Sequence, residues 1–262
     1  MPLSPPDHTL LAAPPLQVTI AQVRFDTCAR LAAVESGRPL LEFLAPLGLT
    51  TMSQVHQQQV ILGPLGPTEP PAGAARQAVG WQFANKEKST SLSVLTDQMT
   101  LETREYGGWP SFSASWENCL AALVEVGSPG LMTRLGLRYV NRIIPAQTKM
   151  IADFQRADLV DPTFLGPAVS SPLSEFVTAT QGRAALSFPD GTDALVQHGV
   201  ALDGGSPAFV LDIDCFRGQA EGFTQERVMA AGAALNDRAL QVFQTIVQPA
   251  LRAEMEIAEV AP

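Results

Sequence analysis

Hydrophobic and polar residues alternate along several segments of the chain, and a two-residue period is typical of β-strands with one buried face. The segments with this pattern, or with β-branched residues between turn formers, are residues 17–25, 55–62, 79–84, 91–96, 99–106, 133–144, 175–188, 193–202 and 208–216. Apolar residues three and four apart predict helices over 29–47, 114–126 and 225–247, with a shorter candidate at 150–158. Because the strands follow one another in hairpin runs, we predict an α+β fold, an antiparallel meander sheet with helices packed on one face and a long C-terminal helix.

Local signals at the helix ends sharpen this prediction. Pro39 lies inside the first helical segment and predicts a kink or a division into two short helices at that point. Gly48 and Gly127 are suited to end the first and second helices. Ser113 and Thr224 are suited to begin the second and the longest helix, because their hydroxyl oxygens can accept hydrogen bonds from free backbone N–H groups.

The order of elements predicts one domain with an internal symmetry. Residues 1–15 are rich in proline and form an extended arm, and residues 16–255 form a single α+β domain. The longest loop signal, rich in Pro, Gly and Ala, covers residues 63–78. Two halves, 16–130 and 131–255, each have a strand, a helical stretch, a meander and a closing amphipathic helix. This order predicts a pseudo-duplication of a β-α-βββ-α unit.

The strand predicted over residues 133–144 has two contrasting faces. The pleat places one set of side chains toward a core: Leu135, Leu137, Tyr139, Asn141 and Ile143. It places the other set on the opposite face: Arg134, Gly136, Arg138, Val140, Arg142 and Ile144. Three arginines therefore point the same way, and the buried amide of Asn141 needs hydrogen-bond partners.

Three interpretations of the row Arg134, Arg138 and Arg142 are open. In the first, the arginines pair across strands with Asp212 and Asp214, which share one face of the strand 208–216, and have no further role. In the second, they form an anion site that binds a phosphate, a carboxylate or a nucleic-acid backbone. In the third, they bind the acidic surface of a partner protein. Arginines paired with the aspartates favour the first interpretation, and arginines that stay unpaired along a groove favour the second.

Trp109 is the one aromatic residue that the sequence places in an exposed position. It lies in the loop Tyr-Gly-Gly-Trp-Pro at residues 106–110, between a strand and a helix. The indole either seats the following helix or contacts a ligand, so it joins the arginines as a candidate binding residue.

Composition and charge narrow the classes of protein. The chain has 262 residues, 46% hydrophobic and 16% charged, which is typical of a globular domain. Its formal net charge of −9 makes nucleic acid an improbable partner, because duplex binding depends on a basic surface. Nearly all of the basic residues are arginine, which indicates a bacterial gene of high GC content.

The sequence also predicts a cytoplasmic protein with no membrane partner. The N-terminal residues have no basic region followed by an apolar run, and no stretch approaches the ~20 apolar residues of a membrane span. Cys28, Cys119 and Cys215 are far apart, and we interpret them as buried thiols in a reducing compartment.

The sequence shows no catalytic motif, and we predict no cofactor. His8, His56 and His198 have no acidic or cysteine neighbour at the spacing of a metal site. The pair Asp212 and Asp214 is of the kind that metal-dependent nucleases use, but no third ligand accompanies it. The chain therefore resembles a binding protein more than an enzyme.

Several motifs together resemble a known family. They are VRF in the first strand, Trp81-Gln82-Phe83, Tyr106 with Trp109 and Phe112, GLRYVNRI at residues 136–143, and LNDRALQVFQTIV in the last helix. This set is similar to a sporadically distributed family of uncharacterised prokaryotic proteins, in which the strand motif reads GLRYINRI or GLRYVNRI. The resemblance implies one architecture of similar length and patchy occurrence among genomes, which is typical of mobile or defence loci. It implies no activity.

Three functions follow from these observations. The first is a non-enzymatic interaction or adaptor protein that acts through a partner protein. The second is a sensor that binds a small anionic ligand or nucleotide between the sheet and the C-terminal helix. The third is a metal-dependent hydrolase or nuclease that uses Asp212 and Asp214.

Overall fold

The computed structural model describes residues 3–9, 11–57, 61–63, 66–68, 77–144, 160–166, 172, 176–203 and 206–256. A ten-stranded sheet forms the body of the molecule. Its strands are β1 (Leu16–Phe25), β2 (Thr51–Gln57), β5 (Gln77–Ala84), β6 (Thr90–Leu95), β7 (Gln98–Thr103), β8 (Leu131–Ile143), β9 (Gly182–Ser187), β10 (Asp193–Asp203), β11 (Ser206–Arg217) and β12 (Glu221–Gly222). Nine of them follow the order β2-β5-β6-β7-β1-β8-β11-β10-β9, and β12 also pairs with β8. Every strand pairing that the structure describes is antiparallel.

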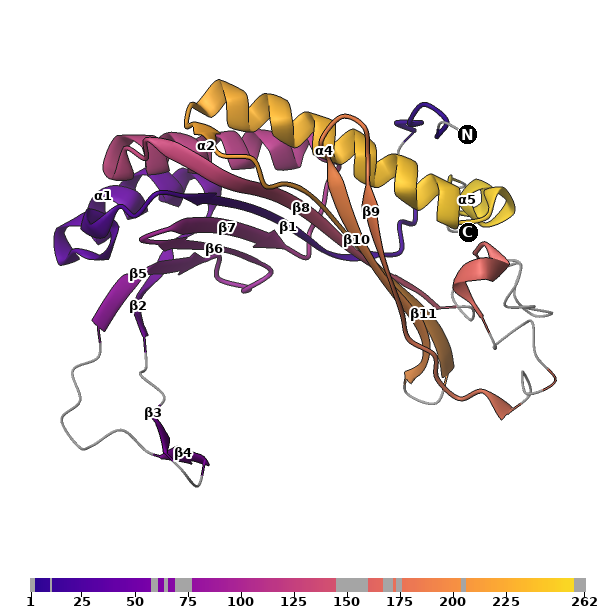
Figure 1. Cartoon of the computed structure of the whole chain (residues 1–262). Helices are drawn as coiled ribbons and strands as arrows, with labels where there is room; N and C mark the ends of the chain where they lie inside the picture. The colour runs from indigo at the N-terminus through magenta and orange to yellow at the C-terminus, as the bar shows by residue number, and fades with distance from the viewer. Residues whose placement is uncertain are drawn as a thin grey trace.

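The helices among the described residues lie on one side of this sheet. They are η1 (Ala29–Ala32), α1 (Val34–Leu44), η2 (Ala45–Leu47), α2 (Trp109–Gly127), η6 (Pro162–Phe164), α4 (Gln225–Ile246) and α5 (Pro249–Glu256). Figure 1 shows the sheet as an arch whose outer side carries α1, α2, α4 and α5 and whose inner side carries no described helix. The α+β class, the antiparallel sheet and the long C-terminal helix are confirmed. Within the described residues, no helix is both long and apolar enough to cross a membrane.

The strand order repeats in the two halves of the chain. In the first half, β1 pairs with β7, the last strand of the meander β5-β6-β7, and in the second half β8 pairs with β11, the last strand of β9-β10-β11. The two first strands, β1 and β8, then pair with each other in the middle of the sheet. This order agrees with the predicted repeat over 16–130 and 131–255, while a duplication of the sequence itself stays a prediction.

The first helical segment divides at a different residue from the one predicted. Ala33 has an extended backbone (φ −67°, ψ 146°) and separates η1 from α1. Helix α1 continues through Pro39, so the predicted division there is wrong. Gly48 ends the segment in the left-handed region at φ 81°, as expected for a helix-ending glycine.

Helix α2 begins earlier than predicted, because the Gly-Gly-Trp-Pro sequence starts the helix instead of forming a loop. Gly108 is its N-cap and Pro110 lies in its first turn, where a residue without an N–H group loses no helical hydrogen bond. Ser113 is therefore inside the helix, and its hydroxyl donates to the carbonyl of Pro110. The prediction for Thr224 is confirmed, since its Oγ1 accepts a hydrogen bond from the backbone N–H of Arg227 at 3.2 Å.

Several strand bounds also differ from the predictions. The strand predicted over 175–188 begins only at Gly182, and the described residues 177–181 before it are not β-strand. The segment predicted as loop over 63–78 contains β4 (Gly66–Thr68), which pairs with β3 (Ile61–Gly63) in a separate hairpin. The helix candidate at 150–158 lies outside the described residues.

The proline-rich arm is held against the last two helices. The backbone N–H of Asp7 donates to the side-chain carbonyl of Gln244 on α4 at 3.0 Å, and the Gln244 amide donates back to the Asp7 carbonyl at 2.6 Å. Farther along, the N–H of Ala13 donates to the carbonyl of Met255 on α5 at 3.0 Å. The arm therefore adds to the helix layer, and its extended conformation stays a prediction.

The core fills the space between the sheet and the helices. Alternate residues of the central strands supply one layer of it, for example Phe83, Leu92 and Phe209, and Trp116 of α2 lies fully buried in the layer above. Asn141 is among these core-facing residues, and its amide donates to the Leu211 carbonyl at 3.3 Å. The alternation predicted from the sequence is therefore confirmed across the sheet.

Both tyrosines of the chain lie beneath the helices and form one chain of hydrogen bonds with Asn236 of α4. The Tyr139 hydroxyl donates to Oδ1 of Asn236 at 2.8 Å, and the hydroxyls of Tyr106 and Tyr139 are 3.3 Å apart. Burial raises the pKa of Tyr139 well above its ordinary value of 10.0 and raises that of Tyr106 as well.

Because these pKa values are raised by folding, the folded state holds the phenolic protons more tightly than the unfolded state. The stability from the two phenols is therefore complete below pH 10 and is lost as the pH rises above it. We expect an alkaline titration, followed by tyrosinate absorbance, to show less than half of the phenol ionised at pH 10 while the circular dichroism stays native. A full ionisation step near pH 10 in the folded protein would contradict this prediction.

Candidate functional site

The arginine row lies on the face of the sheet to which no described helix packs, and we call this the open face. The strand registers place three sets of side chains there around its centre. From β1 they are Ile20, Gln22 and Arg24; from β8, Arg134, Gly136, Arg138, Val140 and Arg142; and from β11, Val210, Asp212, Asp214 and Phe216. The predicted arginine face and the predicted aspartate face thus meet on the same side of the sheet.

Arg138 and Asp212 form a two-pronged ion pair. Nε of Arg138 donates to Oδ1 of Asp212 at 2.7 Å, and one terminal nitrogen donates to Oδ2 at 2.6 Å. The Asp212 side chain is only 10% exposed, whereas that of Arg138 is 41% exposed. The second terminal nitrogen of Arg138 has no hydrogen-bond partner among the described residues.

Arg134 forms the second ion pair of the open face. Its terminal nitrogen donates to Oδ2 of Asp214 at 2.9 Å, and its guanidinium carbon lies 4.7 Å from the centre of the Phe216 ring. The guanidinium is folded back over Gly136, where an added Cβ would overlap it. Gly136 thus leaves the space that this position of Arg134 requires. Burial raises the pKa of the Asp214 carboxyl, although Arg134 and Arg138 both act to lower it.

Gln22 brings a third arginine into the group. Its side-chain carbonyl accepts from Nε of Arg24 at 3.1 Å and from a terminal nitrogen of Arg134 at 3.4 Å. The Gln22 amide is held in turn by the hydroxyl of Thr100 on β7 at 3.1 Å. Arg24 is exposed and forms no ion pair with any described residue. Two guanidinium groups therefore converge on one neutral oxygen.

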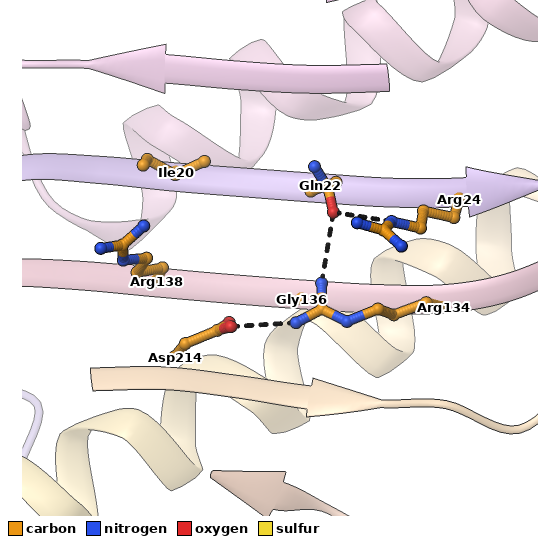
Figure 2. A pocket seen from close by; sticks show the side chains of 7 residues that line it. All are labelled: Ile20, Gln22, Arg24, Arg134, Gly136, Arg138 and Asp214. Carbon is orange, nitrogen blue, oxygen red and sulfur yellow. Dashed lines mark hydrogen bonds and ion pairs between the residues drawn. The ribbon is translucent and has the colours of Figure 1, made fainter. Parts of the chain in front are cut away.

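These side chains surround a hollow of about 260 Å³ at the middle of the open face. Figure 2 shows Arg24 and Arg134 both directed toward Gln22, with Asp214 on the opposite side of Arg134 and Arg138 farther along the strand. The hollow lies over the pairing of β1 with β8, where the two halves of the chain meet. We call it the arginine hollow; its lining residues are Ile20, Gln22, Arg24, Arg134, Gly136, Arg138 and Asp214.

Beyond the hollow the open face is polar with few charges on the side of β5, β6 and β7, and it mixes polar with apolar residues such as Leu195 and Val210 on the other side. On the side of β5, β6 and β7, the residues on this face include Gln82, Ser91, Ser93, Thr100 and Glu102. On the side of β10 and β9 they include Gln197 and Arg183. Hydroxyls and amides can both donate and accept hydrogen bonds, so this face is suited to bind polar groups over a wide area.

The structure brings together some of the predicted binding residues and separates others. Arg134 and Arg138 line the arginine hollow, while Arg142 lies on the same face beyond it. Trp109 is on the other side of the sheet: it begins α2, packs on Phe112 with ring centres 6.2 Å apart, and approaches Gly232 of α4. The indole therefore seats the helix and does not share a site with the arginines.

The carboxylates proposed for a metal site are already engaged by guanidinium groups. Asp212 binds Arg138 through both of its carboxylate oxygens, and Asp214 binds Arg134 through Oδ2, so both carboxylates already face guanidinium groups. Within the described residues no three His, Cys, Asp or Glu side chains lie together as metal ligands would. His8 lies 3.6 Å from Asp237 on the exposed side of α4, and His198 packs between aromatic rings.

The cysteines offer no reactive thiol in this region. Cys119 and Cys215 are buried, and burial raises the pKa of each to about 12, so both stay protonated at neutral pH. Cys28 is half-buried rather than buried as predicted, and burial raises its pKa too.

Two residues of the site, Gln22 and Arg24, were not among the predicted binding residues. The signal for them was present: in the first strand Ile20, Gln22 and Arg24 alternate with the apolar residues Ala21 and Val23. That alternation places Gln22 and Arg24 on the face away from the core, but only the pairing of β1 with β8 sets them opposite Gly136 and Arg134.

These features define the class of protein as an α+β chain with a one-sided, ten-stranded antiparallel sheet and a charged site at its centre. Comparison with protein-family models gives no match for the chain, and comparison with curated protein sequences gives none either. The resemblance to the sporadically distributed prokaryotic family therefore stays a prediction.

Proposed function

We propose that this chain is a non-enzymatic interaction protein, and that it binds an acidic segment of a partner protein on the open face of its sheet. The observation that supports this most is the one-sided construction of the sheet. One face is covered by helices and the other is polar, charged and uncovered by any described helix. An antiparallel sheet needs only one covered face for stability, so the second face is available for binding.

Charge complementarity supports an acidic partner. The chain as a whole carries a net charge of −9, yet the centre of the open face gathers Arg24, Arg134 and Arg138. Arginine is favoured at protein interfaces because its planar guanidinium can bind carboxylates with two parallel hydrogen bonds. A locally positive site on an acidic protein steers acidic segments to that site and repels them from other surfaces.

The two other predicted functions have less support. A ligand site between the sheet and α4 conflicts with the packing there. Helix α4 packs directly on β11, and Leu211 and Ile213 of β11 and Leu235 of α4 are fully buried. The arginine row and α4 are also on opposite faces of the sheet. For a metal-dependent hydrolase, the aspartates would first have to leave their arginine partners.

The test compares two tryptophan variants of the full chain. Ser93→Trp adds bulk to the open face, away from the arginine hollow, and Ala233→Trp adds the same bulk to an exposed position on α4. Tagged wild-type and variant proteins are used to capture partners from the native organism, and proteins and small molecules are identified by mass spectrometry. The identified partner is then purified and its Kd for each variant is measured.

We expect wild type and Ala233→Trp to bind the partner equally, and Ser93→Trp to bind it about tenfold more weakly. Cross-linking is expected to place Asp- and Glu-rich residues of the partner on the open face. Equal binding by both tryptophan variants, selective loss in Ala233→Trp, or recovery of no partner would each overturn the proposal.

A further inference from the structure

The arginine hollow contains hydrogen-bond donors that the chain itself does not use. Arg24 donates only through Nε, to Gln22, so neither of its terminal nitrogens has an acceptor among the described residues. One terminal nitrogen of Arg138 is likewise left over by its ion pair with Asp212. These donors belong to exposed or half-exposed side chains at the edge of one hollow, where an incoming group can reach them.

The charges around the hollow do not balance. Among the described residues, Arg24, Arg134 and Arg138 form ion pairs with only two carboxylates, those of Asp212 and Asp214. Glu102, which also acts on Arg138, is already paired with Arg104 at 3.2 Å, so an excess of one positive charge is left at the hollow. Gln22 holds Arg24 and Arg134 next to each other through a neutral oxygen, and like charges so placed repel. A single negative charge seated between them would relieve this repulsion and complete the hydrogen bonding.

We propose that the arginine hollow is a carboxylate-binding subsite that takes the side chain of one Asp or Glu from the docked partner segment. This inference rests on the proposed function and adds its chemistry. Arg24 supplies the two terminal N–H groups that face the carboxylate. Arg134 supplies a second guanidinium beside it. Gly136 and Gln22 are positioning residues, because they hold the guanidinium of Arg134 in place.

The charge balance favours a carboxylate over a phosphate group. An excess of one positive charge is neutralised by one carboxylate, whereas a phosphate dianion would leave the site negative beside Asp212 and Asp214. A nucleic-acid backbone would need a continued row of cations, but the neighbouring face positions are filled mainly by hydroxyls and amides such as Ser93 and Thr100.

The test uses a displayed library of random short peptides selected on the immobilised full-length protein. The best binders are synthesised, and their affinities are measured by calorimetry for wild type and three variants. Arg24→Glu reverses the charge of an exposed side chain. Gly136→Ala keeps every charge and displaces the guanidinium of Arg134. Arg38→Glu is the control, because Arg38 is 87% exposed on α1 and lies on the helix side of the sheet.

We expect the selected peptides to share an acidic residue. Their affinity is expected to fall about tenfold in Arg24→Glu and in Gly136→Ala, and to be unchanged in Arg38→Glu. Replacing the shared acidic residue by its amide is expected to weaken binding to wild type by a similar factor. Thermal unfolding of each variant verifies that the change in binding does not come from unfolding.

Three outcomes would overturn the inference. The first is a set of selected peptides without a shared acidic residue, and the second is equal binding of the peptides by wild type and Arg24→Glu. The third is displacement of the peptide by inorganic phosphate, or by a single-stranded oligonucleotide, at a lower concentration than by glutamate. The proposed function fails separately. If binding of the partner is lost in Ser93→Trp but unchanged in Arg24→Glu, the open face is still the docking surface. Only the carboxylate subsite is then overturned.

Discussion

Replacing Gly80 by alanine is expected to lower the free energy of unfolding by about 4 kcal/mol. Gly80 is buried in β5 with φ +151°, a conformation that other residues adopt only with strain. An added Cβ would overlap the backbone carbonyl oxygen of Val94 and lie 2.7 Å from the Cα of Leu95, both on the neighbouring strand β6. Backbone atoms of a paired strand cannot move aside without breaking the pairing, so the strain and the overlap add.

The matched control is Gly48→Ala. Gly48 also has a positive φ, +81°, but no atom lies within 4 Å of the position of an added Cβ. This variant isolates the conformational cost, which is expected to be about 1 kcal/mol. Urea unfolding of both variants, compared with wild type at equal m-value, measures the two costs. If Gly80→Ala is no less stable than Gly48→Ala, the packing of β5 against β6 described here is wrong.

The faces of the strands could be predicted from the sequence, because the pleat alone decides which side chains share a side. Arg134 and Arg138 on one face of β8, and Asp212 and Asp214 on one face of β11, were predicted in this way and are confirmed by the registers. The partners within these sets could not be predicted. Asp214 is directly opposite Arg138, yet Arg138 binds Asp212 and Asp214 binds Arg134. Both pairs run diagonally across the strands: Asp212 is opposite Val140, two residues along β8 from Arg138, and Asp214 is opposite Arg138, four residues along from Arg134.

The position of Trp109 was predicted wrongly, and the role of Gln22 was not predicted, for different reasons. Trp109 was placed in a loop because Gly-Gly-Trp-Pro resembles a turn, but proline is also favoured in the first helical turn, and that preference governs here. The role of Gln22 depends on which strand lies beside β1. Sequence periodicity does not specify that β1 and β8, which are more than a hundred residues apart, form the central pair.

The same diagonal pairing makes Asp212→Asn the most informative substitution on the open face. We expect it to lower the free energy of unfolding by about 2 kcal/mol, because the nearly buried Asp212 accepts two charged hydrogen bonds from Arg138. The loss is smaller than for a fully buried pair, since the half-exposed Arg138 keeps part of its hydration. Urea unfolding of the full chain measures this difference.

Asp214→Asn is the comparison, and its expected cost is under about 1 kcal/mol. Burial raises the pKa of Asp214, so the folded protein holds its charged form less favourably than the unfolded chain does. Removing that charge loses the ion pair with Arg134 and at the same time removes the cost of burying a carboxylate. An equal or larger loss in Asp214→Asn than in Asp212→Asn would contradict the assignment of the tighter pair to Arg138 and Asp212.

The double replacement Arg138→Met with Asp212→Leu separates structure from function at this site. Exchanging both members of an ion pair for apolar residues of similar volume is often neutral for stability, so the double variant is expected to be close to wild type in urea. A metal-dependent enzyme would lose its carboxylate ligand in this variant and in Asp212→Asn alike. A docking surface centred on Arg24 would keep its partner, because the hollow retains Arg24, Gln22 and Arg134. If a stable double variant still binds the partner, the ion pair of Arg138 with Asp212 has a structural role in the open face. If the variant loses binding, the ion pair is itself part of the docking site.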